Sequence, residues 1–78
     1  MSGGRLPVTN GKEVIRALTK AGFVVDRIVG SHHVMAFPGD PTRAVTVPVH
    51  SGRDLEPGTL RSIIRQAGLS IEEFAKLL

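Results

Sequence analysis

Two adjacent histidines are the residues of this sequence best suited to chemistry. They stand in the run Gly30-Ser31-His32-His33, directly after a glycine-first pair that is typical of a tight hairpin turn. An imidazole titrates near neutral pH, so such a side chain can act as a general acid or base. Because successive strand residues point to opposite faces, the two imidazoles should not act as a pair, and only one is a good catalytic candidate.

Other kinds of site have weaker support. The third histidine, His50, is distant in the sequence, there is no cysteine, and no histidine spacing typical of a metal site occurs, so we expect no metal ion and no other cofactor. Ser31 beside His32 lacks the Gly-x-Ser-x-Gly pattern of serine hydrolases. The glycine-rich motifs that cradle nucleotide phosphates are also missing, which argues against nucleotide hydrolysis.

Basic residues recur at helical spacing in two segments, so that each segment should carry one stripe of positive charge. The stripes consist of Lys12, Arg16 and Lys20 in the first segment and Arg61 and Arg65 in the second. The formal net charge is +3. Such a stripe is either a solvated face or a surface that follows RNA phosphates, and the basic balance slightly favours RNA.

The elements that position these residues follow from periodicity and turn signals. Asn10 and Glu13 have capping-box spacing before an apolar helical pattern that ends at Gly22, and Pro57 suits the first turn of a second helix. Branched and alternating runs predict strands at 23–29, 32–37 and 43–49, and residues 70–78 predict a short terminal helix. Pro48 places the third strand at a sheet edge. The sequence therefore predicts an α+β fold in the order α-β-β-β-α, with helices on one face of a three-stranded antiparallel sheet and a short extra C-terminal helix.

The chain is long enough for one domain only. Residues 1–9 are rich in glycine and show no periodicity, so we expect a flexible leader there and a single domain at 10–78 of the 78 residues. It has neither the apolar stretch of a signal peptide nor an apolar run that could span a membrane, and the lack of cysteine suits a reducing compartment. We therefore expect a cytoplasmic protein with no membrane partner.

These features together resemble the HicA family of toxins, also called YcfA-like. The resemblance covers residues 12–69 and lies in several separate motifs that occur in the family's order. These are Lys12 to Leu18, Ala21-Gly22-Phe23, Gly30-Ser31-His32-His33, Pro38, Val45-Thr46-Val47-Pro48, and the run from Pro57-Gly58-Thr59-Leu60 to Gly68-Leu69.

The resemblance implies a fold like that of double-stranded-RNA-binding domains and an activity as a ribosome-independent mRNA interferase. Such a toxin cleaves mRNA, arrests growth and is neutralised by a HicB-type antitoxin that masks its active site. The family's catalytic histidine corresponds to His32. Phe37 departs from many members, which have a histidine before the matching proline; any assistance from that histidine is missing here.

RNA carries its own nucleophile, the 2′-hydroxyl, so cleavage needs a base and nearby cations but no metal ion. We therefore expect a metal-independent endoribonuclease with His32 as general base. RNA contacts are expected from Ser31 and from the residues of both basic stripes, Lys12, Arg16, Lys20, Arg61 and Arg65. The alternatives that stay open are a non-catalytic RNA-binding module and an antitoxin-binding module of the same fold.

Overall fold

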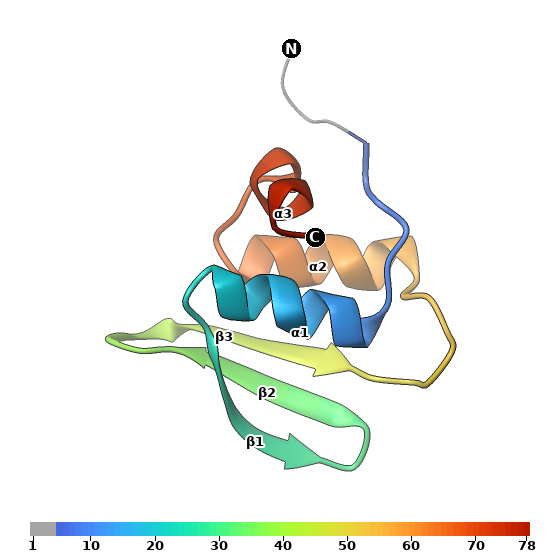
Figure 1. Cartoon of the computed structure of the whole chain (residues 1–78). Coiled ribbons are helices and arrows are strands. Elements are labelled where there is room, and N and C mark those ends of the chain that lie inside the picture. Colours follow the sequence, from blue (N-terminus) through green and yellow to red (C-terminus); the bar gives the residue numbers. More distant parts are fainter. Residues whose placement is uncertain (1–4) are drawn as a thin grey trace.

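Three helices lie on one side of a single sheet, and two of them form the layer next to it (Figure 1). The computed structural model describes residues 5–78. The elements are α1 (Gly11–Lys20), β1 (Val24–Val29), β2 (His32–Phe37), β3 (Asp40–Pro48), α2 (Pro57–Gln66) and α3 (Ile71–Leu77). The sheet has three antiparallel strands in the order β1-β2-β3. The α+β fold with one open sheet face, predicted from the sequence, is confirmed.

One hydrophobic core lies between the helices and the sheet. Helices α1 and α2 run side by side over β3, and α3 packs on their outer side (Figure 1). The apolar positions that recur along both long helices are buried, as their spacing predicts. The core comprises Val14, Ala17, Leu18, Phe23, Met35, Val45, Val47, Leu60, Ile63, Ile64, Ala67 and Phe74. Among residues 5–78, no helix has the length and apolar character needed to cross a membrane.

The helix starts use the capping residues that the sequence offers. The Asn10 side chain accepts a hydrogen bond from the Glu13 amide, and Ser70 and Glu73 form a full capping box at α3. At α1 the box is incomplete, because the Glu13 carboxylate accepts from the Thr9 hydroxyl at 2.9 Å instead. Thr9 is buried and Leu6 packs against the core, so packing extends into the expected leader, of which residues 1–4 lie outside the described part.

The first hairpin has the predicted turn. Val29 pairs with His32 across a two-residue loop, and Gly30 has φ +59° while no described residue other than glycine has positive φ. A positive φ at the first loop residue alone is the pattern of a type II′ turn. The turn therefore fixes which residues of β1 lie opposite which residues of β2.

Strand β3 begins earlier than predicted. The prediction of a strand at 43–49 was wrong at its start, because Phe37 already pairs with Asp40 and the turn is only Pro38-Gly39. Pro41 is tolerated inside β3 since the strand lies at the sheet edge, where a missing N–H costs no ladder bond. The strand ends at Pro48, one residue before the predicted end, and it lies at the sheet edge, as Pro48 predicted.

Candidate functional site

The Gly30-Ser31 turn sends the two adjacent histidines to opposite faces of the sheet. His33 is in line with Met35, which is buried under the helices, so its side chain points to the helix layer. His32 points to the open face and is exposed. The expectation that the imidazoles cannot act side by side agrees with this geometry.

His32 stands near one end of the open face. Its neighbours across the sheet are Val29 on β1 and Pro48 on β3, both apolar. Its imidazole makes no hydrogen bond to another side chain of residues 5–78, so it is available to a ligand. The carbonyl of Ser31 accepts a hydrogen bond from the Val49 amide at 2.7 Å, which ties the turn to the end of β3. The position of His32 is therefore fixed by backbone on both sides.

His33 lies in a groove on the other side of the sheet, between α1, β1 and the loop after β3. The groove encloses about 830 Å³ and is lined by Asn10, Lys12, Ile15, Val25, Ile28, His33, Val49, His50, Ser51 and Gly52. The Nδ1 atom of His33 is buried and has no hydrogen-bond partner in the described chain. Buried polar atoms usually have a partner, so this unpaired nitrogen is an exception among the described residues.

A close backbone contact brings the start of α1 to this groove. Gly11 is buried against the end of β3, and a Cβ atom there would overlap the carbonyl oxygen of Pro48. Only glycine allows this approach, which places Lys12 on the groove wall. The loop after β3 is held in the same place, because Asn10 forms a β-bridge with Asp54 and the Leu55 amide donates to the Thr9 carbonyl.

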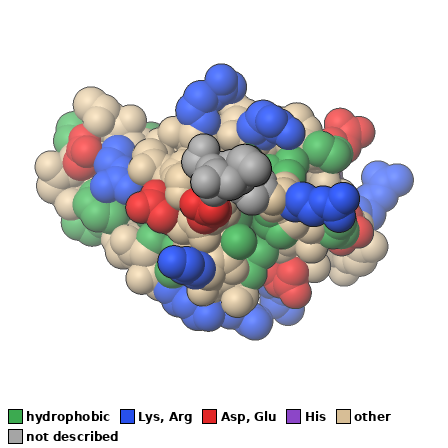
Figure 2. All heavy atoms as spheres, turned by 90° about the horizontal axis from the view of Figure 1, so that it is seen from above, with side chains coloured by type: hydrophobic (Ala, Val, Ile, Leu, Met, Phe, Trp, Pro, Cys, Tyr) green, Lys and Arg blue, Asp and Glu red, His purple; other side chains and the backbone are tan. Residues whose placement is uncertain are grey.

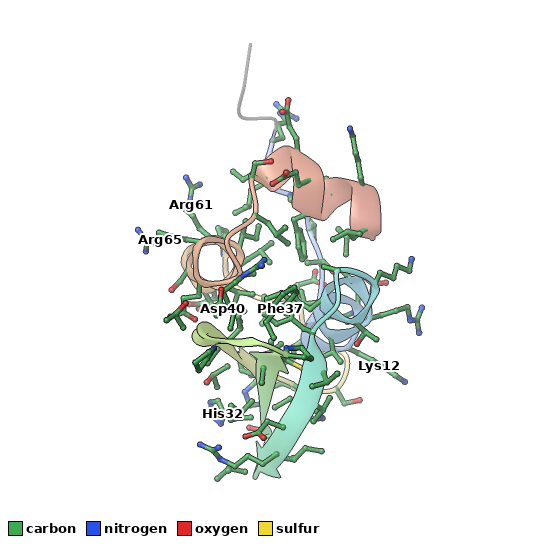
Figure 3. The ribbon with its side chains drawn as sticks, turned by 90° about the vertical axis from the view of Figure 1, so that its left-hand side faces the viewer. Lys12, His32, Phe37, Asp40, Arg61 and Arg65 are labelled. Atoms are coloured by element: carbon green, nitrogen blue, oxygen red, sulfur yellow. The ribbon has the colours of Figure 1, made fainter. Side chains whose placement is uncertain are left out.

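The two basic stripes lie on the helix layer and not around His32. Lys12 projects from α1 on one flank, whereas Arg61 and Arg65 project from α2 on the opposite flank (Figure 3). Arg16, Arg61 and Arg65 are exposed, and the Lys20 ammonium donates to the carbonyl of Leu77 at 3.1 Å. Seen from the helix side, basic side chains are spread around the edge of the molecule, with acidic side chains between them (Figure 2). Of the six expected RNA contacts, Ser31 precedes His32 in the chain and the other five lie on α1 and α2.

Sequence reasoning missed Arg27 and His50. Arg27 pairs with Val34 and therefore shares the open face with His32, where its guanidinium forms an exposed ion pair with Asp26 at 2.9 Å. The sequence contained a signal for Arg27. A two-residue turn places Val29 opposite His32, and residues two apart in a strand share a face, so Arg27 lies on the face of His32. His50 lines the same groove as His33, and no local signal in the sequence indicates that residues 17 positions apart share it.

Phe37, the residue that departs from many HicA-like sequences, has a packing role here. Its ring meets Phe23 edge-on with centroids 5.0 Å apart, and the guanidinium of Arg43 lies 4.1 Å from its centroid. Arg43 also donates two hydrogen bonds, of 3.1 and 2.6 Å, to the carbonyl of Ala67 at the end of α2. This end of the sheet is therefore closed by stacking and hydrogen bonds.

The model of the family described as HicA toxin of bacterial toxin-antitoxin matches residues 11–69. The chain belongs to the HicA toxin family. The match begins with α1, includes the sheet with both adjacent histidines, and ends before α3. No curated protein matches the chain.

Membership of the HicA family confirms the family resemblance found in the motifs. The HicA toxin family belongs to bacterial toxin-antitoxin systems, and its members are generally ribonucleases, so this chain is a toxin whose family implies an antitoxin partner. Within residues 5–78, no three His, Asp or Glu side chains gather closely enough to hold a metal ion. The candidate site is thus the exposed His32 and the groove behind it.

Proposed function

We propose that this HicA toxin is a metal-independent endoribonuclease that cleaves mRNA, with His32 as its general base. One observation carries the proposal: the imidazole of His32 is exposed and free of side-chain partners on the open face of the sheet. A base must reach the proton that it removes, and an RNA strand lying on the open face would present its 2′-hydroxyl to this imidazole.

The reaction needs few groups from the protein. His32 removes the proton of a 2′-hydroxyl, whose oxygen attacks the adjacent phosphorus. The bond from phosphorus to the 5′-oxygen of the next nucleotide breaks, and that oxygen takes a proton from solvent. The products are a 2′,3′-cyclic phosphate and a 5′-hydroxyl end. Among the cations, Arg27 shares the face of His32, so its guanidinium supports the negative charge that develops on the phosphoryl oxygens.

Apart from Ser31, the remaining expected RNA contacts then act at a distance from the scissile bond. Ser31 positions the strand beside His32, and Lys12 and Arg16 on α1 attract the backbone on one flank. Lys20 is next along this stripe, although its ammonium is held by Leu77, while Arg61 and Arg65 lie on the other flank of the helix layer. These side chains contribute binding strength and salt dependence, and no chemistry.

The test compares two exposed histidines at the same end of the sheet. We expect His32→Gln to lower the rate of RNA cleavage in excess chelator by about 10²–10⁴-fold, the usual contribution of a general base. RNA affinity should be retained, and expression of His32→Gln should no longer arrest growth. His50→Gln is the matched control, because His50 is also exposed. Equal cleavage by His32→Gln and the unaltered chain would place the chemistry elsewhere.

The product ends and the antitoxin provide separate checks. Products with 3′-hydroxyl ends would rule out attack by the 2′-hydroxyl. Salt-sensitive RNA binding without cleavage by the unaltered chain would favour a binding module. We further propose that a HicB-type antitoxin neutralises the toxin by covering the region of His32. Adding purified antitoxin should therefore stop cleavage in proportion to the complex formed.

A further inference from the structure

Strand β1 is the least covered element of the fold. All six of its residues are exposed, and it carries large apolar side chains on both faces. Val24 and Val29 lie on the open face with exposed fractions of 49% and 60%, whereas Val25 and Ile28 lie on the helix face with 44% and 58%. Neither α1 nor α2 extends over β1 (Figure 1). An apolar edge strand exposed in this way marks an interaction surface.

The two edges of the sheet differ in what they can accept. At the β3 edge, Pro41 and Pro48 have no N–H group to offer, so this edge is a poor template for a further strand. Strand β1 has no proline, and its outer edge pairs with no other strand of residues 5–78. A bulge interrupts it between Val25 and Arg27, after which Arg27, Ile28 and Val29 keep a regular register. The β1 edge is thus open for strand addition.

The groove behind β1 continues this surface. Val25 and Ile28 line it together with Ile15 and Val49, which gives an apolar floor. The polar part of the lining contains no carboxylate and is formed by Lys12, His33 and His50 together with Asn10 and Ser51. A segment that binds here should therefore offer apolar side chains next to acidic ones.

We propose that the β1 edge and this groove together form the docking surface for an extended acidic strand of the antitoxin. The identity of the partner rests on the proposed function, whereas the surface rests on the exposure of β1. Unpaired backbone N–H and C=O groups along an edge are satisfied by another polypeptide strand, and RNA has no matching row of groups. A second copy of this chain fits less well, because pairing of two β1 strands would bring two Lys12-lined grooves of the same charge together.

The location explains how docking would stop cleavage. Val29 on β1 is the cross-strand neighbour of His32 on β2. Adjacent strands lie about 4.8 Å apart, so a strand added to β1 would lie about 10 Å from β2. A folded protein attached to that strand would cover the adjoining open face. The antitoxin would then exclude RNA from His32 without having to bind the imidazole.

The test uses Ile28 variants and the purified cognate HicB-type antitoxin. Ile28→Gln should weaken antitoxin binding by at least about 30-fold, as expected for a central interface residue. Ile28→Glu should weaken antitoxin binding more than Ile28→Gln does, and Ile28→Lys should weaken it less, because the arriving strand is acidic. Val8→Gln is the matched control, since Val8 is 82% exposed and does not line the groove. RNA cleavage by free Ile28→Gln should stay within about threefold of the unaltered toxin, the usual range for a surface change.

A second measurement needs no variant. Amide hydrogen exchange of the unaltered toxin should show the outward-facing amides of β1 becoming protected when the antitoxin binds. Antitoxin binding unchanged in Ile28→Gln, with β1 amides unprotected, overturns the proposal even if the toxin cleaves RNA.

A free toxin that is dimeric, and that Ile28→Glu makes monomeric, would assign the surface to a second copy. Loss of RNA binding in Ile28→Gln with antitoxin binding intact would assign it to RNA. Failure of the toxin to cleave RNA would leave the docking result readable, because binding is measured separately.

Discussion

The two ends of the sheet use their polar side chains in opposite ways. At the Pro38-Gly39 end, the guanidinium of Arg43 stacks on Phe37 and donates both of its hydrogen bonds to the carbonyl of Ala67. At the Gly30-Ser31 end, His32 is exposed without a side-chain partner, and the buried Nδ1 atom of His33 has none within the described chain. Satisfied polar groups stabilise a fold, whereas an exposed group without a side-chain partner, such as the imidazole of His32, is available to a ligand. The polar side chains at the Pro38-Gly39 end therefore stabilise the fold, whereas we propose that His32 at the other end acts on a bound ligand.

The largest expected effect is at the Pro38-Gly39 end of the sheet, which we call the closed end. Arg43→Met keeps most of the side-chain volume but leaves the Ala67 carbonyl without its two charged donors and removes the cation from the two phenylalanine rings. We expect the free energy of unfolding to fall by about 2–3 kcal/mol, measured by urea denaturation, because hydrogen bonds to charged groups contribute most.

The matched variant is Arg65→Met, which changes an exposed arginine on α2. A surface substitution of this kind should change stability by no more than about 0.5 kcal/mol. Equal destabilisation by both variants would mean that the stacking and hydrogen bonds of Arg43 contribute little, and the contrast between the two ends would be lost.

Arg43 also shows what could not be predicted from the sequence. Local patterns predicted every helix and strand, since capping residues, apolar periodicity and turn glycines act over a few positions. Arg43 acts on Ala67, 24 positions away, and nothing near it indicates that contact. The start of β3 was missed because the run from Pro38 to Pro41 looked like one long turn, although Pro38-Gly39 suffices and the edge position tolerates Pro41.

The candidate site divides in the same way. The turn places His32 and His33 on opposite faces by a rule of alternation, so their separation followed from the sequence. The groove did not, because it depends on Gly11 packing against Pro48 and on the loop that carries His50. The basic stripes were visible as stripes, but their position on the helix layer, away from the open face of His32, required the order of the layers.

A smaller effect is expected at the Gly30-Ser31 end of the sheet. His33→Phe replaces an imidazole whose buried Nδ1 atom has no partner in the described chain by a ring of similar size. Because an unsatisfied buried polar atom costs free energy, we expect the free energy of unfolding to stay the same or rise by up to about 1 kcal/mol. A loss above about 2 kcal/mol would show that the imidazole is satisfied in solution, and the two ends would then be alike. His32→Phe serves as the comparison, with no change expected because that side chain is exposed.

The smallest expected effect is a pH dependence of the free energy of unfolding that comes from Asp40 at the closed end. A hydrogen bond from the Thr42 hydroxyl lowers the pKa of Asp40 below its usual value of 3.8, with further contributions from the Thr42 amide and the charge of Arg43. A carboxyl whose pKa is lower in the folded state adds stability above its unfolded pKa, and this part is lost as the pH falls through the folded value. Asp40→Asn should therefore be slightly less stable than the unaltered chain at pH 7 and should approach it at pH 2, in paired urea titrations. Thr42→Val should reduce the same pH dependence, and the double variant should show no larger reduction than Asp40→Asn alone, because both changes remove one interaction. An unchanged pH dependence in Asp40→Asn would mean that the turn at the closed end is held by backbone and rings alone.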